Sequence, residues 1–267
     1  ASEIFAGAIQ DRKAGTIITT DYARFDRIGA DGAVTPVRKY DMTELELKFR
    51  YGKNEKFYQT HDERIPITYD ALIFNLEHTM SKKGFLGSSY DYHRTELGIQ
   101  KRLWFSAFGF VDVIGKAGKV WNKVPYPLLI LPNANLTYTI QPEAYTNMNA
   151  IEFINDEYIS WDVTYYMNGL ILNRLPLIKK LKWREVLCFR GLWGHLTDKN
   201  NPMKTGEGLY AFPVGSGVMG RAPYMEASVG IENIFKFMRL DYVWRLNYRD
   251  HPGIQKRGIR CTMSLSF

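Results

Sequence analysis

Histidine and its carboxylate neighbours are the residues in this chain that could perform acid–base chemistry. Among the five histidines, the nearest thing to a catalytic dyad is His93 with Asp91, which lies two residues earlier in an expected strand. Side chains at this spacing share one face of a strand, and an Asp–His pair beside a nucleophile is the requirement of a hydrolase triad. Such pairs are also common by chance in strands. We therefore expect no catalytic site and interpret the chain as non-enzymatic.

Patterns for metal ions and disulfides are equally sparse. The sequence contains neither His-x-x-x-His nor Cys-x-x-Cys, the spacings typical of metal sites. Asp156-Glu157 and Asn200-Asn201 could offer oxygen ligands to calcium, but acidic loop residues usually face water. We expect no metal and no cofactor. Cys188 and Cys261 fall on opposite faces of their expected strands, which argues against a disulfide between them.

Charge and hydropathy limit the partners and the kind of membrane segment. The net charge of +7 favours contact with anionic surfaces, such as lipopolysaccharide or acidic lipid. No dense Lys/Arg tract occurs, so nucleic acid is not expected as a partner. The longest apolar run, Tyr126–Pro132, is interrupted by prolines, whereas a spanning helix needs about 20 apolar residues. A membrane barrel remains open, because only alternate residues of its strands must be apolar.

Alternation of apolar and polar residues, the period of a β-strand, is the dominant pattern and reaches the end of the chain. One face of the last segment, 258–267, is apolar throughout; its members are Ile259, Cys261, Met263, Leu265 and Phe267. An amphipathic final strand that ends in Phe resembles the outer-membrane assembly signal, an edge offered for β-augmentation. We expect these residues to act as that signal. The alternative is a strand that merely ends the chain.

Two other segments separate charge from apolar surface. In 238–248, one face is apolar and consists of Leu240, Tyr242, Trp244 and Leu246. The opposite face carries charge, as does one face of the segment near residue 45; the charged residues are Arg239, Asp241 and Arg245, and Glu44, Glu46, Lys48 and Arg50. A cation that faces lipid at mid-bilayer costs about 2–4 kcal/mol. We therefore expect the charged residues to face a lumen and the apolar residues to face lipid.

The number of expected strands indicates whether residues 1–267 supply all strands of the barrel. Strands are expected near residues 2–10, 14–24, 44–51, 69–79, 88–100, 103–118, 159–168, 181–194, 225–232, 238–248 and 258–267. That gives eleven strands, or thirteen if 119–156 contains a hairpin. Bacterial single-chain barrels have an even number, so we expect residues 1–267 to be the C-terminal portion of a longer barrel protein. With the C-terminus in the periplasm, the connections 52–66, 172–180 and 233–237 fall inside, and 119–156 and 197–221 fall outside.

Three stretches carry a resemblance to a known family: Asn133–Tyr138, Met148–Asp156 and Asn173–Glu185. They resemble the barrel of a Bacteroidetes outer-membrane family of unknown function, in which a carboxypeptidase-regulatory-like domain precedes the barrel. The resemblance implies an all-β fold, an antiparallel transmembrane β-barrel, in the bacterial outer membrane.

That family's barrel is similar to the barrel of the outer-membrane assembly-factor and surface-antigen superfamily, whose members insert or translocate proteins. Phe110-Val111-Asp112 ahead of Gly118–Trp121 resembles its strand motif, and Gly84–Gly87 resembles its loop motif without the arginine. The resemblance implies a role in outer-membrane biogenesis or transport. It implies the barrel-assembly machinery and other outer-membrane proteins as partners. A small-solute pore and a soluble all-β binding module are the alternatives.

Overall fold

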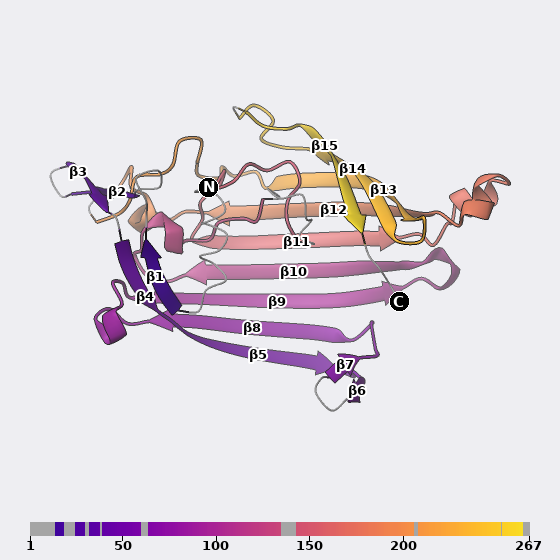
Figure 1. Ribbon diagram of the computed structural model, residues 1–267, viewed down its shortest axis with the longest axis horizontal. Helices are drawn as coiled ribbons and strands as arrows, with labels where there is room; N and C mark the ends of the chain where they lie inside the picture. The colour runs from indigo at the N-terminus through magenta and orange to yellow at the C-terminus, as the bar shows by residue number, and fades with distance from the viewer. Residues whose placement is uncertain are drawn as a thin grey trace.

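A single antiparallel sheet of nine strands forms most of the protein (Figure 1). The computed structural model describes residues 14–18, 25–29, 32–37, 39–59, 64–134, 143–205, 208–251 and 253–263. Its strands follow one another across the sheet in chain order, so that the fold is an up-and-down meander. They are β5 (Leu45–Lys53), β8 (Leu72–Ser81), β9 (Tyr92–Trp104), β10 (Phe110–Val120), β11 (Glu157–Tyr166), β12 (Arg184–His195), β13 (Tyr224–Ile234), β14 (Met238–Arg245) and β15 (Arg257–Met263).

Three two-stranded units accompany the main sheet. They are β1 (Ala14–Ile18) with β4 (Lys39–Thr43), β2 (Phe25–Ile28) with β3 (Val34–Val37), and β6 (Phe57–Gln59) with β7 (Arg64–Pro66). Segment 14–24 was expected to join the barrel, but its described residues, 14–18, form β1 and pair with β4 in a separate sheet. The long turn expected at 52–66 contains the β6–β7 hairpin. Segment 2–10 lies outside the described residues.

The connections gather at two ends of the main sheet (Figure 1). At the loop end lie 82–91, 121–156, 196–223 and 246–256; at the turn end lie 54–71, 105–109, 167–183 and 235–237. The grouping expected from the sequence is therefore present, with 119–156 and 197–221 at one end and 52–66, 172–180 and 233–237 at the other. No further hairpin forms within the described parts of 119–156.

The two faces of the main sheet differ in chemistry because strand side chains alternate. In the pairing of β14 with β15, Leu240 lies opposite Cys261 and Tyr242 opposite Ile259, while Asp241 lies opposite Arg260. We call the face with Leu240 and Tyr242 the apolar face and the face with Asp241 and Arg260 the charged face. The apolar face exposes large side chains from β5 to β15; examples are Leu45, Leu47, Phe49, Tyr51, Leu97, Ile99, Val229, Ile259 and Met263.

The hydrophobic core lies against the charged face, near the loop end. We call residues 121–156 the inserted segment. Its described parts, 121–134 and 143–156, fold back over this face together with the described parts of loop 196–223. The fully buried apolar residues include Val124, Leu129, Phe153 and Ile154 of the inserted segment and Val120 and Tyr224 of the sheet. The charged face is thus covered at one end, whereas the apolar side chains named above are exposed in the described part of the chain.

The main sheet has two edges, formed by β5 and β15. Among the described residues no pairing joins these two strands, so the sheet is not closed into a barrel. The helical elements found in the described part are 3-10 turns of three or four residues. None of the helices in that part has the length and hydropathy to cross a membrane.

Candidate functional site on the charged face

A buried ion pair fastens the inserted segment to the sheet. Arg245 of β14 and Glu152 of the inserted segment join through both carboxylate oxygens, at 2.9 and 2.5 Å. The two side chains are 0% and 1% exposed. Arg245 also donates to the carbonyl oxygens of Asn147 and Tyr248, at 3.0 and 2.7 Å. All these contacts are charge-assisted and dry, which makes them strong.

Glu152 collects further donors besides Arg245. Its carboxylate accepts the backbone N–H of Asn149 at 3.0 Å, and Nδ1 of His251 lies 2.8 Å from it. Burial alone would raise the pKa of Glu152, but the hydrogen bonds from Arg245 and Asn149 outweigh it and hold the pKa below its usual range. Glu152 is therefore ionised at neutral pH and acts as an anionic anchor for one strand and one loop.

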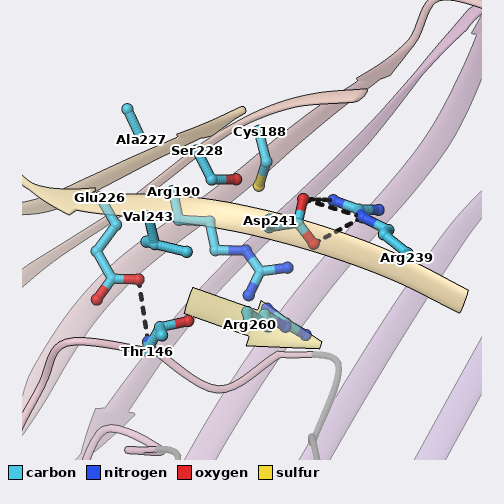
Figure 2. A pocket seen from close by; sticks show the side chains of 10 residues that line it. All are labelled: Thr146, Cys188, Arg190, Glu226, Ala227, Ser228, Arg239, Asp241, Val243 and Arg260. Atoms are coloured by element: carbon cyan, nitrogen blue, oxygen red, sulfur yellow. Dashed lines mark hydrogen bonds and ion pairs between the residues drawn. The ribbon is translucent and has the colours of Figure 1, made fainter. Parts of the chain in front are cut away.

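Glu226 of β13 is a second anchor, placed on the sheet side. Its carboxylate accepts the backbone N–H of Thr146 at 3.0 Å (Figure 2). It also accepts the backbone N–H of Asn147 and the hydroxyl of Tyr224, both at 2.7 Å. Arg190 of β12 adds a hydrogen bond to the carbonyl oxygen of Ala144 at 3.1 Å. Residues 144–152 are thus held by the sheet through polar contacts at both ends.

Beside these anchors lies a small pocket rich in paired charge (Figure 2). Arginines from β12, β14 and β15 line it, together with two carboxylates; the residues are Arg190, Arg239, Arg260, Glu226 and Asp241. Arg239 binds Asp241 through contacts of 2.7–3.0 Å, and Arg190 pairs with Asp162 at 2.6 Å. The arrangement can hold polar groups against the sheet. Cys188 also lines the pocket, and its thiol lies 3.7 Å from the Asp162 carboxylate.

The structure brings only part of the predicted charged set together. Arg239, Asp241 and Arg245 lie on the charged face, and Asp241 and Arg245 are each 2% exposed. The set near residue 45 lies on the far edge strand or just before it, away from the pocket. There Lys48 contacts Glu46 and Glu77 at 3.2 and 3.3 Å, Arg50 pairs with Glu55 at 2.6 Å, and Glu44 is half-buried.

The predicted apolar residues lie apart from this charge. Leu240, Tyr242 and Leu246 are exposed, and Trp244 is half-buried with its ring 4.7 Å from that of Tyr242. In β15, Ile259 and Met263 are exposed and Cys261 lies between them on the same face. Leu265 and Phe267, the last two residues of the expected assembly signal, lie outside the described residues.

The residues considered for catalysis and for calcium serve other contacts. Asp91 pairs with Lys82 at 3.2 Å and accepts the backbone N–H of Lys83, while the ring of His93 lies 5.7 Å from that of His78. In the described part of the chain, no group of three or more His, Cys, Asp or Glu residues is placed to hold a metal ion. Both cysteines are free thiols on opposite faces.

The oxygens offered to calcium belong to a loop junction. Asp156 accepts the backbone N–H of Thr197 at 3.0 Å and the side-chain amide of Asn200 at 2.9 Å. The side-chain oxygen of Asn200 accepts the backbone N–H of Val124 at 2.9 Å. These contacts tie loop 196–223 to the inserted segment.

Three residues of the site were not predicted from the sequence. They are Glu152, Glu226 and Tyr224. Tyr224 is 0% exposed on the charged face, packed against Tyr145 and Phe153. A signal for Glu152 was available in the sequence. A lone carboxylate within an apolar run, Ala150-Ile151-Glu152-Phe153-Ile154, needs a buried partner.

Comparison with known proteins places the fold. Residues 21–201, more than half of the chain, match the family described as "Family of unknown function (DUF5686) C-terminal domain". No curated protein matches the chain. A similar solved structure is the crystal structure of BamA from Haemophilus ducreyi lacking POTRA domains 1–3, with 7% identity and a TM-score of 0.50. The likeness covers 98% of this chain and 47% of that one, so this chain spans about half the length of the BamA chain. It shows a shared all-β fold.

Proposed function

Because the chain belongs to the family of unknown function DUF5686, through its C-terminal domain, we propose that it is part of a non-enzymatic outer-membrane β-barrel. The barrel works in outer-membrane biogenesis or transport. One observation carries the proposal: across nine strands, large apolar side chains occupy one face and paired charges occupy the other. Bare apolar surface of this extent is costly in water and favourable in lipid.

Strand length supports the same proposal. The nine strands of the main sheet run from 7 to 13 residues, and a tilted strand needs about 9–11 to cross a bilayer. Soluble strands are shorter, with about five or six residues. In this proposal Leu240, Tyr242, Trp244 and Leu246 face lipid, and the charged face lines a lumen that the inserted segment partly fills. The C-terminus lies in the periplasm.

The proposal includes partners and a larger whole. An open sheet edge is not tolerated in hydrocarbon, so further strands or another chain complete the sheet. By the resemblance described above, a carboxypeptidase-regulatory-like domain precedes this one in a Bacteroidetes protein. Lipopolysaccharide contacts the loop end. The barrel-assembly machinery receives Ile259, Cys261, Met263, Leu265 and Phe267 during insertion.

A matched pair of probes tests the lipid assignment. Leu47 and Lys48 are neighbours on β5, both exposed, on opposite faces. We would replace each with cysteine, attach an environment-sensitive fluorophore and reconstitute the protein in lipid vesicles. We expect brominated lipid to quench the label at 47 and aqueous iodide to quench the label at 48. The reverse result would overturn the assignment, and two water-accessible labels would favour a soluble module.

The small-solute pore is tested separately. The inserted segment and loop 196–223 cover the loop end of the charged face, so we expect no steady conductance in planar bilayers. Sustained single-channel conductance would contradict the proposal in favour of the pore.

A further inference from the structure

A second pocket lies at the loop end, apart from the one beside the anchors. Separate parts of the chain meet there: the β2–β3 hairpin, β4, the loop 82–91, the start of the inserted segment and loop 196–223. The lining residues are Arg27, Val37, Lys39, Tyr40, Lys83, Ser89, Tyr90, Asp91, Asn122, Lys123 and Tyr210. The cavity volume is about 510 Å³. That is ample for a small polar ligand.

The pocket has an excess of positive charge. Arg27, Lys39, Lys83 and Lys123 line it, against one carboxylate, Asp91. That carboxylate is already engaged by Lys82, at 3.2 Å, which does not line the pocket. Lys39 contacts Asp41 at 3.6 Å. Within the described residues, no ion pair is formed by the side chain of Arg27, Lys83 or Lys123.

Two polar atoms at this pocket have no hydrogen-bond partner among the described residues. They are the hydroxyl of Tyr40 and the side-chain oxygen of Asn122, and both atoms are buried. Tyr40 is 3% exposed, and an unsatisfied buried hydroxyl costs about 1–3 kcal/mol. Burial raises the pKa of Tyr40 well above its usual range, so the hydroxyl keeps its proton and can donate. A ligand that accepts this hydrogen bond would satisfy it.

The walls of the pocket are well braced. The rings of Phe25 and Tyr210 stack at 5.3 Å, and the hydroxyls of Tyr90 and Tyr210 are 2.8 Å apart. Backbone hydrogen bonds of 2.7–2.9 Å join β2 to residues 208–211. The aromatic wall and the strand that carries Arg27 are therefore held in place before any ligand binds, which lowers the entropy cost of binding.

From this geometry we propose that the loop-end pocket binds a phosphate group, with the buried Tyr40 hydroxyl as donor and Arg27, Lys83 and Lys123 as counter-charges. Several cations around one space fit a dianion better than a monoanion. The phosphate can belong to a soluble molecule or to a phosphorylated lipid headgroup. The proposal is independent of the proposed function, because it does not depend on which solvent the apolar face meets.

Binding of a soluble phosphate compound is tested first. The full chain in detergent is titrated with pyrophosphate at constant ionic strength, and binding is measured by calorimetry. We expect saturable binding that Tyr40→Phe weakens about tenfold, the effect of one lost hydrogen bond to a charged group. Tyr126→Phe is the matched control, because Tyr126 packs in the same aromatic cluster without lining the pocket. The control should bind as the unaltered protein does.

The charge is tested with Lys83→Gln combined with Lys123→Gln. We expect this pair to weaken pyrophosphate binding by at least about tenfold, against little change for Lys179→Gln with Lys180→Gln, which removes equal charge at the turn end. For the lipid source, phosphatidic acid is added to phosphatidylcholine nanodiscs and its retention is measured by mass spectrometry. Retention that depends on Tyr40, Lys83 and Lys123 identifies a lipid headgroup, and pyrophosphate binding without it identifies a soluble ligand.

Two results would overturn the proposal. One is that neither pyrophosphate nor phosphatidic acid binds the unaltered protein. The other is that binding falls equally in the pocket variants and in their controls, which would indicate attraction by net charge alone. Circular dichroism of each variant checks that the fold is kept.

Discussion

Replacing Glu152 with Gln should release the inserted segment from the sheet. The substitution keeps the size of the side chain but leaves the guanidinium of Arg245, which is 0% exposed, without its counter-charge. Breaking a buried pair in this way costs about 3–5 kcal/mol. Arg245 retains the carbonyl oxygens of Asn147 and Tyr248 as acceptors. We therefore expect about 3 kcal/mol, the low end, which is roughly a hundredfold change in an equilibrium constant.

Hydrogen exchange measured by mass spectrometry reads this release directly. Amides of Thr146, Asn147 and Asn149 are bonded to the two carboxylate anchors, so peptides covering 143–156 should exchange roughly a hundredfold faster in Glu152→Gln. Glu143→Gln is the matched control: it lies on the same segment and loses an exposed pair with Lys116, worth about 0–1 kcal/mol. Equal exchange in the two variants would refute the reasoning.

The same anchor predicts a pH dependence. The pKa of Glu152 is lowered in the folded protein, so its contribution to stability is present above the unfolded value of 4.5. It is lost as the pH falls below 4.5 toward the folded pKa. Exchange of 143–156 should accelerate in this acid range in the unaltered protein. In Glu152→Gln the acceleration should be absent, and an identical acid response in both proteins would show that another group is responsible.

Three further predictions concern single positions. Burial raises the pKa of Glu44 to about 7, so stability should fall as the pH rises through 7, and Glu44→Gln should remove that fall in urea unfolding at pH 6 and 8. Gly109→Ala should destabilise the fold by at least about 1–3 kcal/mol, since φ is +94° and a Cβ would lie 1.9 Å from the Tyr166 carbonyl oxygen; Gly98→Ala, with ordinary contacts only, is its control. Deleting Phe267 should lower surface levels in cells more than it lowers stability in detergent, and normal surface levels would contradict the assembly signal.

The strands were predictable because their signal is local. A period of two needs no knowledge of partners, and the segment expected at 238–248 is found as Met238–Arg245. The short strand β4 was missed because its five residues give too short a run of alternation to stand out. Segments 14–24 and 2–10 alternate poorly, and the first of them joined a different sheet from the one expected.

The anchors could not be predicted in the same way, because they depend on residues far apart in sequence. Alternation placed Arg245 on the charged face, and the free-energy cost of a cation in lipid predicted that its side chain faces a lumen. In the structure its side chain is dry, since Glu152 reaches it across 93 positions of sequence and brings Phe153 and Ile154 as an apolar cover. Charge on one face of a sheet is therefore no measure of the water there. At the loop end of this protein, the charges hold a folded loop in place, and the same alternation that predicts a lumen also builds the wall on which that loop docks.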